Sequence, residues 1–226
     1  MRAILILALS FATIGCLERP QVDLREPIYL VAEESFWDEC EECPAGWMAC
    51  HADRMAAVYN GIDEWFQYFP ESARPVALVV WPEENVPDGA ANALIRLKIK
   101  EGGCKKPDGY HPACYRWSQD SLGRNRPPEI IFDHPGAIDP QMVAHEFGHA
   151  LGRDDNDVPE WQYSVMSYSH PSYVVPVDID LVCALHPEVD CPPHVWCVDI
   201  DDLCRCPSDS FEDGMAKFGA GEIVCR

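Results

Sequence analysis

The hydrophobic pattern predicts four strands in the first part of the chain. Short apolar runs occupy residues 28–32, 76–81 and 129–132, whereas residues 93–99 alternate between apolar and charged side chains. An unbroken apolar run is typical of a strand buried on both faces, so we expect 76–81 to lie in the centre of a sheet. Alternation is typical of a half-exposed strand. We therefore expect 93–99, or the segment that follows it, to form the sheet edge.

Two segments have the pattern of longer helices. Over residues 51–69 the apolar side chains recur every three or four residues, and Pro70 ends the segment. Residues 140–151 follow Asp139, a preferred N-cap, and Gly152 stands where a helix C-terminus favours a left-handed residue. The order of strands and helices predicts an α/β domain with a mostly parallel sheet. The apolar face of 51–69 is expected in its core, through Met55, Val58, Tyr59, Ile62, Trp65, Phe66 and Phe69.

The sequence begins with the features of an export signal. A positively charged start is followed by an apolar run over residues 3–14, which is too short for a stable transmembrane helix. The run ends in Gly-Cys and resembles the lipobox of bacterial lipoproteins, with Thr13 where leucine is usual. This resemblance implies that Cys16 is acylated, and the alternative is ordinary cleavage near Gly15 followed by free secretion. We expect residues 1–16 to be a signal and residues 17–27 a linker.

The chain contains twelve cysteines, which indicates an oxidising compartment. If Cys16 carries lipid, eleven remain, so one thiol is free or bonded to another molecule; without lipidation all twelve can pair. We expect Cys104 to pair with Cys114 and to staple the loop between them. An alternative role for the C-x-x-C at Cys40 and Cys43 is a zinc site built from cysteines.

The composition and the apolar pattern of the sequence change near residue 187. Five cysteines with little apolar periodicity between them predict a small disulfide-stapled tail over residues 187–226. The acidic stretch DIDD, Asp199 to Asp202, is a candidate calcium site, although it lacks the EF-hand pattern. An adhesion role for the tail is a further hypothesis.

The charge of the chain is strongly acidic. It carries 17 Lys and Arg against 38 Asp and Glu, which gives a formal net charge of −21. Nucleic acid and anionic membrane surfaces repel such a protein and are not expected partners. Contact with a membrane is expected only through the lipid on Cys16. The predicted location is the cell envelope as a lipoprotein, or otherwise the medium as a secreted protein.

The segment HEFGHALGRDD, residues 145–155, carries the strongest chemical signal. His145 and His149 lie four residues apart on the predicted helix, so their side chains share one face. Two imidazoles in this arrangement can bind one zinc ion, at about 2.0–2.1 Å. Glu146 lies on the adjoining face, where its carboxylate can take a proton from metal-bound water. Surface or capping roles are expected for the other histidines, which are His51, His111, His134, His170, His186 and His194.

This segment resembles the signature of the metzincin zinc peptidases, H-E-x-x-H-x-x-G-x-x-H. His145, Glu146, His149, Gly152 and Asp155 match it position by position, with aspartate in the last place. Some members of the family have aspartate there, and the resemblance implies that Asp155 is the third zinc ligand. The neighbouring Asp154 is the alternative third ligand.

A second mark of that family lies a short loop downstream. SVMSY, residues 164–168, is similar to the methionine turn of several metzincin branches. The resemblance implies that Met166 forms the hydrophobic floor of the zinc site and that Tyr168 reaches toward the zinc or the oxyanion. Residues 177–185 resemble the final helix of these enzymes. The resemblance covers residues 28–186 and implies two to three helices on a sheet with an antiparallel edge strand.

The resemblance implies a zinc-dependent endopeptidase that acts on extracellular or envelope proteins. Three protein ligands and a water leave the zinc site open, as in catalytic sites. Glu146 would be the general base, and a protein or peptide substrate would lie extended along the sheet edge. The competing hypothesis is a zinc-containing binding or adhesion lipoprotein without turnover. The presence of Glu146 favours the enzyme.

Overall fold

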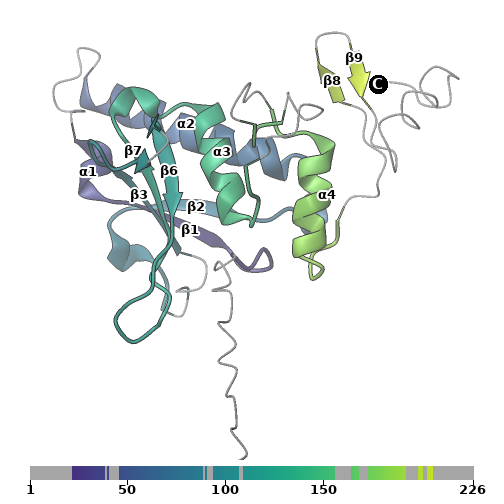
Figure 1. Ribbon diagram of the computed structural model, residues 1–226, viewed down its shortest axis with the longest axis horizontal. Coiled ribbons are helices and arrows are strands. Elements are labelled where there is room, and N and C mark those ends of the chain that lie inside the picture. Colours follow the sequence, from purple (N-terminus) through teal and green to yellow (C-terminus); the bar gives the residue numbers. More distant parts are fainter. Residues whose placement is uncertain are drawn as a thin grey trace, which may run out of the picture.

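The main sheet of the protein has five strands. The computed structural model describes residues 22–38, 40, 46–88, 90, 94–106, 109–155, 164–167, 173–191, 198–200 and 203–205. The strand order is β2-β1-β3-β7-β6 (Figure 1), and all neighbours are parallel except β6, which runs antiparallel to β7. The predicted α/β fold, with a mostly parallel sheet and an antiparallel edge strand, is confirmed. The strands are β1 Ile28–Ala32, β2 Ala77–Val80, β3 Leu94–Ile99, β6 Ala113–Arg116 and β7 Glu129–Phe132.

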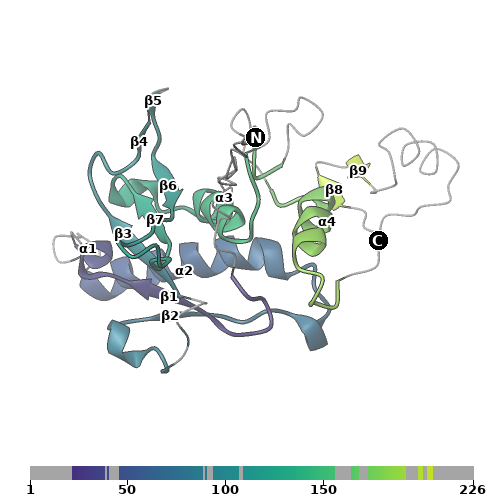
Figure 2. The same cartoon turned by 60° about the horizontal axis from the view of Figure 1, so that its bottom comes forward.

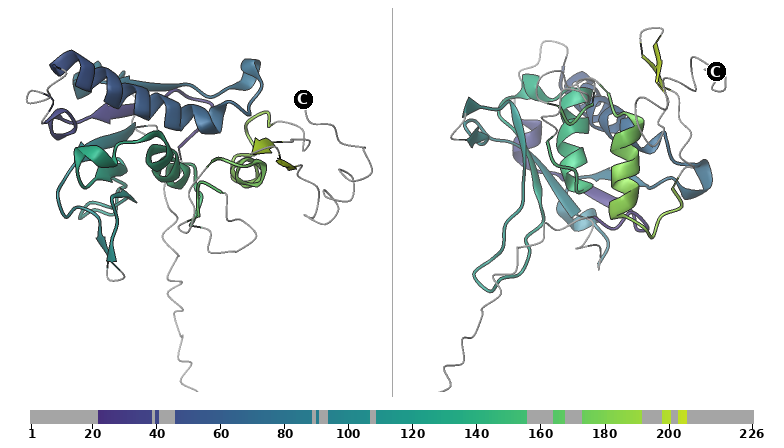
Figure 3. Two further views of the ribbon diagram at one scale, coloured as in Figure 1. Left: turned by 90° about the horizontal axis from the view of Figure 1, so that it is seen from above. Right: turned by 45° about the vertical axis from the view of Figure 1, so that its right-hand side comes forward.

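Four α-helices lie in the described part of the chain: α1 Glu34–Trp37, α2 Trp47–Phe66, α3 Pro140–Ala150 and α4 Pro176–Leu185. The one-turn α1 was not predicted, and α2 begins and ends earlier than the predicted 51–69. In Figure 1, α3 stands between the sheet and α4, and Figure 3 shows α3 and α4 side by side with α2 running across them. None of the helices described combines the length and apolar character that a membrane span requires.

The position of 76–81 in the sheet was predicted wrongly, and of the two predicted edge segments it is the one after 93–99 that contains an edge strand, β6. The apolar run 76–81 gives β2, which is an edge strand, and the alternating segment gives β3, which is central. At the β2 edge Leu78 is 40% exposed, and the backbone N–H of Val79 donates to the Tyr59 hydroxyl at 3.3 Å. No residue of β2 is fully buried, and Val76 and Trp81 beside it are 51% and 55% exposed, so this apolar run did not mark a strand covered on both faces. The charged side chains of β3 are accommodated centrally by ion pairs, Arg96 with Glu33 and Glu83, and Lys98 with Glu129.

Helices α2 and α3 pack closely together and form much of the core. Trp65 is fully buried, and its indole N–H donates to the Ala144 carbonyl at 2.8 Å. The backbones approach so closely at Gly61 that a Cβ there would lie 2.5 Å from the Pro140 carbonyl oxygen. Of the predicted apolar face of α2, Tyr59 turns toward β2, and the buried members are Val58, Ile62, Trp65, Phe66 and Phe69.

Three disulfides are formed in the described residues. Cys104 pairs with Cys114, as predicted, Cys40 pairs with Cys50, and Cys183 pairs with Cys191. The Cys40 thiol is therefore not available for a zinc site with Cys43. The first cysteine of the tail is bonded back to α4. The remaining strands form two small hairpins, of which the first projects from the sheet (Figure 2): β4 Lys105–Lys106 with β5 Gly109–Tyr110, and β8 Val198–Ile200 with β9 Leu203–Arg205.

Candidate metal centre

The candidate centre is built on α3, whose two ends have strong sequence signals. Asp139 is the N-cap, and its carboxylate accepts a hydrogen bond from the Met142 backbone at 3.0 Å. At the other end Gly152 has φ +90°, as expected for a left-handed helix stop. The Gly152 N–H donates to the His149 carbonyl at 3.1 Å, and the Arg153 N–H donates to the Gly148 carbonyl at 2.9 Å. This paired arrangement folds residues 153–155 back over the helix end.

Both histidines of α3 are buried and held by backbone carbonyls. His145 Nδ1 lies 2.7 Å from the Val165 carbonyl oxygen, and His149 Nδ1 lies 2.8 Å from the Arg153 carbonyl oxygen. A carbonyl oxygen can only accept, so Nδ1 of each ring carries the hydrogen. In the neutral imidazoles Nε2 is then a lone-pair donor. The two rings lie 5.0 Å apart, nearly perpendicular.

The third residue at the centre is Asp155. Its Oδ1 lies 3.2 Å from His145 Nε2 and 3.2 Å from His149 Nε2. The adjacent Asp154 is exposed. Two imidazole nitrogens and a carboxylate oxygen therefore converge on one point, and their lone pairs repel one another unless a proton or a metal cation lies between them. One ligand atom each of His145, Glu146 and His149 also lie within 4.8 Å of one another, so this group could hold a metal ion.

The electrostatics of the buried side chains also favour a positive charge at this point. Burial lowers the pKa of His145, but the Asp155 carboxylate, the charge of Glu146 and the Val165 carbonyl outweigh it, and the pKa is raised. For Glu146, burial raises the pKa against the opposing charges of the two imidazoles and a hydrogen bond from the Tyr115 backbone. The site thus combines a centre that attracts a cation with a carboxylate suited to accept a proton.

Met166 lies directly beneath α3. It is fully buried, and a Cβ added at Gly148 would lie 2.4 Å from its sulfur and 2.6 Å from the Trp65 ring. The Met166 sulfur therefore packs against α3 at Gly148, the residue that precedes His149. A glycine inside a helix has low intrinsic propensity, and the sequence alone gives no reason for it at position 148. Its role is visible once Met166 and Trp65 are placed around it.

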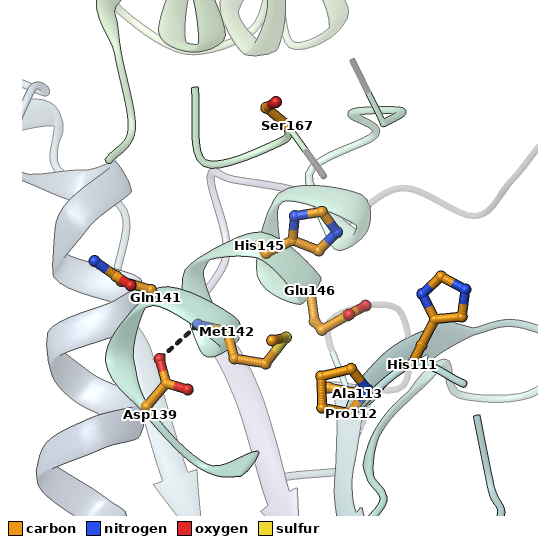
Figure 4. Close-up of a pocket in the computed structure, with 9 residues that line it drawn as sticks. All are labelled: His111, Pro112, Ala113, Asp139, Gln141, Met142, His145, Glu146 and Ser167. Atoms are coloured by element: carbon orange, nitrogen blue, oxygen red, sulfur yellow. Dashed lines mark hydrogen bonds between the residues drawn. The ribbon is translucent and has the colours of Figure 1, made fainter. Parts of the chain in front are cut away.

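A pocket of about 240 Å³ opens beside Glu146. Figure 4 shows the Met142 thioether and the Glu146 carboxylate facing it from α3, with His111 and Pro112 on the opposite side. His111 was expected to be a surface or capping residue, and its place in this pocket was missed. His111 stands just before β6 and is brought near α3 by the pairing of β6 with β7. The spacing of residues along the sequence does not reveal this contact. The full lining is His111, Pro112, Ala113, Asp139, Gln141, Met142, His145, Glu146 and Ser167.

Two other histidines have packing roles beyond the predicted surface or capping positions, and His186 is the C-cap of α4, as the capping prediction allows. His186 is 2% exposed, with Nε2 3.2 Å from the Leu151 carbonyl oxygen and Nδ1 3.1 Å from Glu188. It therefore holds α4 against the end of α3. His51 stacks on Trp37, with ring centroids 4.2 Å apart.

Several predicted residues lie outside the part of the chain that the structure describes. These are Cys16, the proposed lipidation site, Tyr168 and the histidines at 170 and 194. The candidate calcium stretch Asp199–Asp202 is described only in part, without its side chains. The structure thus brings together His145, Glu146, His149, Asp155 and Met166 from the predicted set.

The chain was compared with protein-family models and with curated proteins. No family model matches it, and no curated protein shows significant sequence similarity to it.

Proposed function

We propose that this protein is a zinc-dependent endopeptidase of the metzincin type. The observation that carries the proposal is the convergence of His145 Nε2, His149 Nε2 and Asp155 Oδ1, with both histidines 3.2 Å from the carboxylate oxygen. Two ligand atoms on a tetrahedral zinc ion with bonds of about 2.0–2.1 Å lie about 3.3–3.4 Å apart. The donor set and its spacing therefore fit zinc. Imidazole nitrogen and carboxylate oxygen are both accepted zinc ligands.

The chemistry of the site divides between the ion and the chain. When bound, zinc would polarise the scissile carbonyl and acidify a water molecule. Glu146 lies next to the first ligand, and its buried carboxylate accepts the proton of the attacking water and delivers it to the leaving amine. A hydrogen bond from the Tyr115 backbone acts to lower the pKa of this carboxylate and so favours its ionised form. Tyr168 is assigned to the oxyanion by the family resemblance.

The substrate is proposed to be a peptide segment in extended form. β6 is the edge strand on the side of α3, so its outer backbone groups can pair with an added strand. The pocket beside Glu146 lies between this strand and α3 and offers room for one side chain. Its walls at Met142, Pro112 and Ala113 are apolar. This arrangement supports cleavage of a chain that runs along β6.

The proposed setting is outside the cytoplasm. The three disulfides are compatible with export, since such bonds persist in oxidising compartments. We propose that the substrates are extracellular or envelope proteins and that Cys16 provides a lipid anchor. The strong negative charge supports basic or neutral substrates rather than nucleic acid.

The experiment that tests the proposal is a peptide-library digestion. Residues 17–226 are expressed in an oxidising compartment, loaded with zinc and compared with Glu146→Gln, with Asp154→Asn as the matched acidic control. We expect cleavage by the parent and by Asp154→Asn, and a loss of about 10³-fold or more in Glu146→Gln, which keeps its zinc. A folded, zinc-loaded parent that cleaves nothing contradicts the proposal and favours the binding-protein alternative.

A further inference from the structure

A buried carboxylate outside the metal centre joins the two turns that orient its histidines. Asp178, the third residue of α4, is fully buried. Its Oδ1 accepts a hydrogen bond from Arg153 Nη2 at 3.2 Å, and both of its oxygens lie 2.9 Å from Ser164 Oγ. The backbone N–H of Val175 donates to Oδ2 at 3.1 Å. Three segments of the chain therefore meet at one side chain.

Two of these contacts lead to a histidine. Arg153 supplies the carbonyl oxygen that accepts from His149 Nδ1. The Ser164 hydroxyl accepts a hydrogen bond from the Met166 backbone at 3.0 Å and so fixes the turn between them. The middle residue of that turn supplies the carbonyl oxygen that accepts from His145 Nδ1. Asp178 therefore contacts the residue behind one imidazole and the turn behind the other.

The position of these carbonyls decides where the imidazoles point. The acceptor at Nδ1 fixes both the tautomer and the rotation of a ring, and hence the direction of its Nε2 lone pair. Neither carbonyl belongs to a strand or to the regular part of a helix, because both lie in turns. A buried ion pair adds little stability relative to apolar packing, so the Arg153–Asp178 pair is better explained by the geometry that it imposes.

We propose that Asp178 is a positioning residue that fixes the Nδ1 acceptors of His145 and His149 together and so aims both Nε2 atoms at one point. The inference rests on the proposed zinc site. The orientation of the two imidazoles does not itself depend on a metal, because every contact named above is made by the chain alone. The role is indirect, since Asp178 acts on the ligands through Arg153 and Ser164.

The first test measures zinc affinity. Asp178→Asn keeps the size of the side chain and removes its charge, and the zinc dissociation constant is read by competition with a chromophoric chelator. We expect binding to weaken about 10–100-fold, the usual effect of losing a partner of metal ligands. The control is Val182→Ala, one turn further along α4, which removes buried core packing without touching the network. Its affinity is expected to stay within about twofold of the parent. Parent-like affinity in folded Asp178→Asn overturns the proposal.

A second variant guards against simple unfolding. Asp178→Asn leaves the Arg153 guanidinium buried without its carboxylate, which is strongly destabilising in many proteins. The double variant Arg153→Met, Asp178→Asn removes both charges and is expected to fold. It should show the same loss of zinc affinity as the single variant. Full affinity in the double variant would contradict a positioning role.

A third measurement needs no zinc. Nitrogen-15 NMR of the metal-free protein reports which ring nitrogen carries the hydrogen, and Nδ1 is expected for both His145 and His149 in the parent. Ser164→Ala should perturb His145 and leave His149 unchanged, whereas Asp178→Asn should perturb both. Unchanged spectra in Asp178→Asn overturn the inference. If the parent binds no zinc, the proposed function fails, while this measurement still decides the role of Asp178.

Discussion

At the scale of single residues, the packing of α3 behind the candidate metal centre depends on the absence of a side chain at Gly148. A methyl group there would meet the Met166 sulfur at 2.4 Å and the Trp65 ring at 2.6 Å. We expect Gly148→Ala to destabilise the fold by about 1–3 kcal/mol, because overpacking outweighs the better helix propensity of alanine. Chemical denaturation measures this. Gln141→Ala, at an exposed position of the same helix, is the control and should change stability by less than about 0.5 kcal/mol. Equal effects of the two variants would contradict the tight packing.

Tyr68 should make the fold sensitive to alkaline pH. Its hydroxyl donates to the Val174 carbonyl at 2.8 Å, and burial, followed by the charges of Glu64 and Asp178, raises its pKa to about 12. The unfolded chain loses this proton at a pKa of about 10, so folding stability falls as pH rises from about 10 to about 12. The total loss attributable to Tyr68 is about 2–3 kcal/mol. Urea unfolding of the parent and of Tyr68→Phe across this range measures it. A constant difference between them would contradict the prediction.

The site residues that the sequence predicts are those that lie close together within one helix or turn. His145, Glu146 and His149 lie on one helix, and helical periodicity alone places their side chains together. The turn at Gly152 was also predictable, because its cap chemistry is encoded within a few residues. His111 and Asp178 could not be found in this way. Their contacts with the site depend on strand pairing and on helix packing between distant segments.

At the scale of elements, β6 is held in place by a disulfide and a strand neighbour. Cys104 and Cys114 close a loop of 10 residues and pack with Ile131 in a small separate cluster. Replacing both cysteines with alanine is expected to cost about 2–3 kcal/mol. The looser strand should raise KM for peptide substrates and leave zinc affinity unchanged. Removing the Cys183–Cys191 pair, far from β6, is the control and should not raise KM. Loss of zinc in the first variant would contradict a role limited to the strand.

The strands show that the apolar pattern predicts where a strand lies in the sequence but not its place in the sheet. Residues 28–32 and 129–132 were predicted with the observed bounds, because apolar side chains mark a strand covered on its faces. The same signal at 76–81 gave a strand but the wrong place in the sheet. Strand order depends on how the connections cross between the helices. β6 itself was hidden in a segment rich in glycine, proline and polar residues, since only part of it is buried.

At the scale of the whole molecule, bound zinc should stabilise the fold. The ion would tie the middle of α3 to residue 155, and binding restricted to the folded state stabilises it by about 2.7 kcal/mol when free zinc is 100 times the dissociation constant. For a chain of this size, the chelated protein should melt about 5–10 °C lower than the zinc-loaded one. Differential scanning calorimetry with and without chelator measures the shift. Asp155→Ala should show a much smaller response, and an equal response would exclude Asp155 as a ligand.

The two carbonyls that receive the imidazole hydrogens come from different distances along the chain. Arg153 follows its histidine by 4 residues, whereas Val165 follows its histidine by 20. One half of the centre can therefore form together with α3, and the other half must wait for a later segment to fold back. We expect a chain emerging from synthesis or export to complete the candidate metal centre last. For the proposed peptidase, late capture of the metal would delay any activity until the chain is complete.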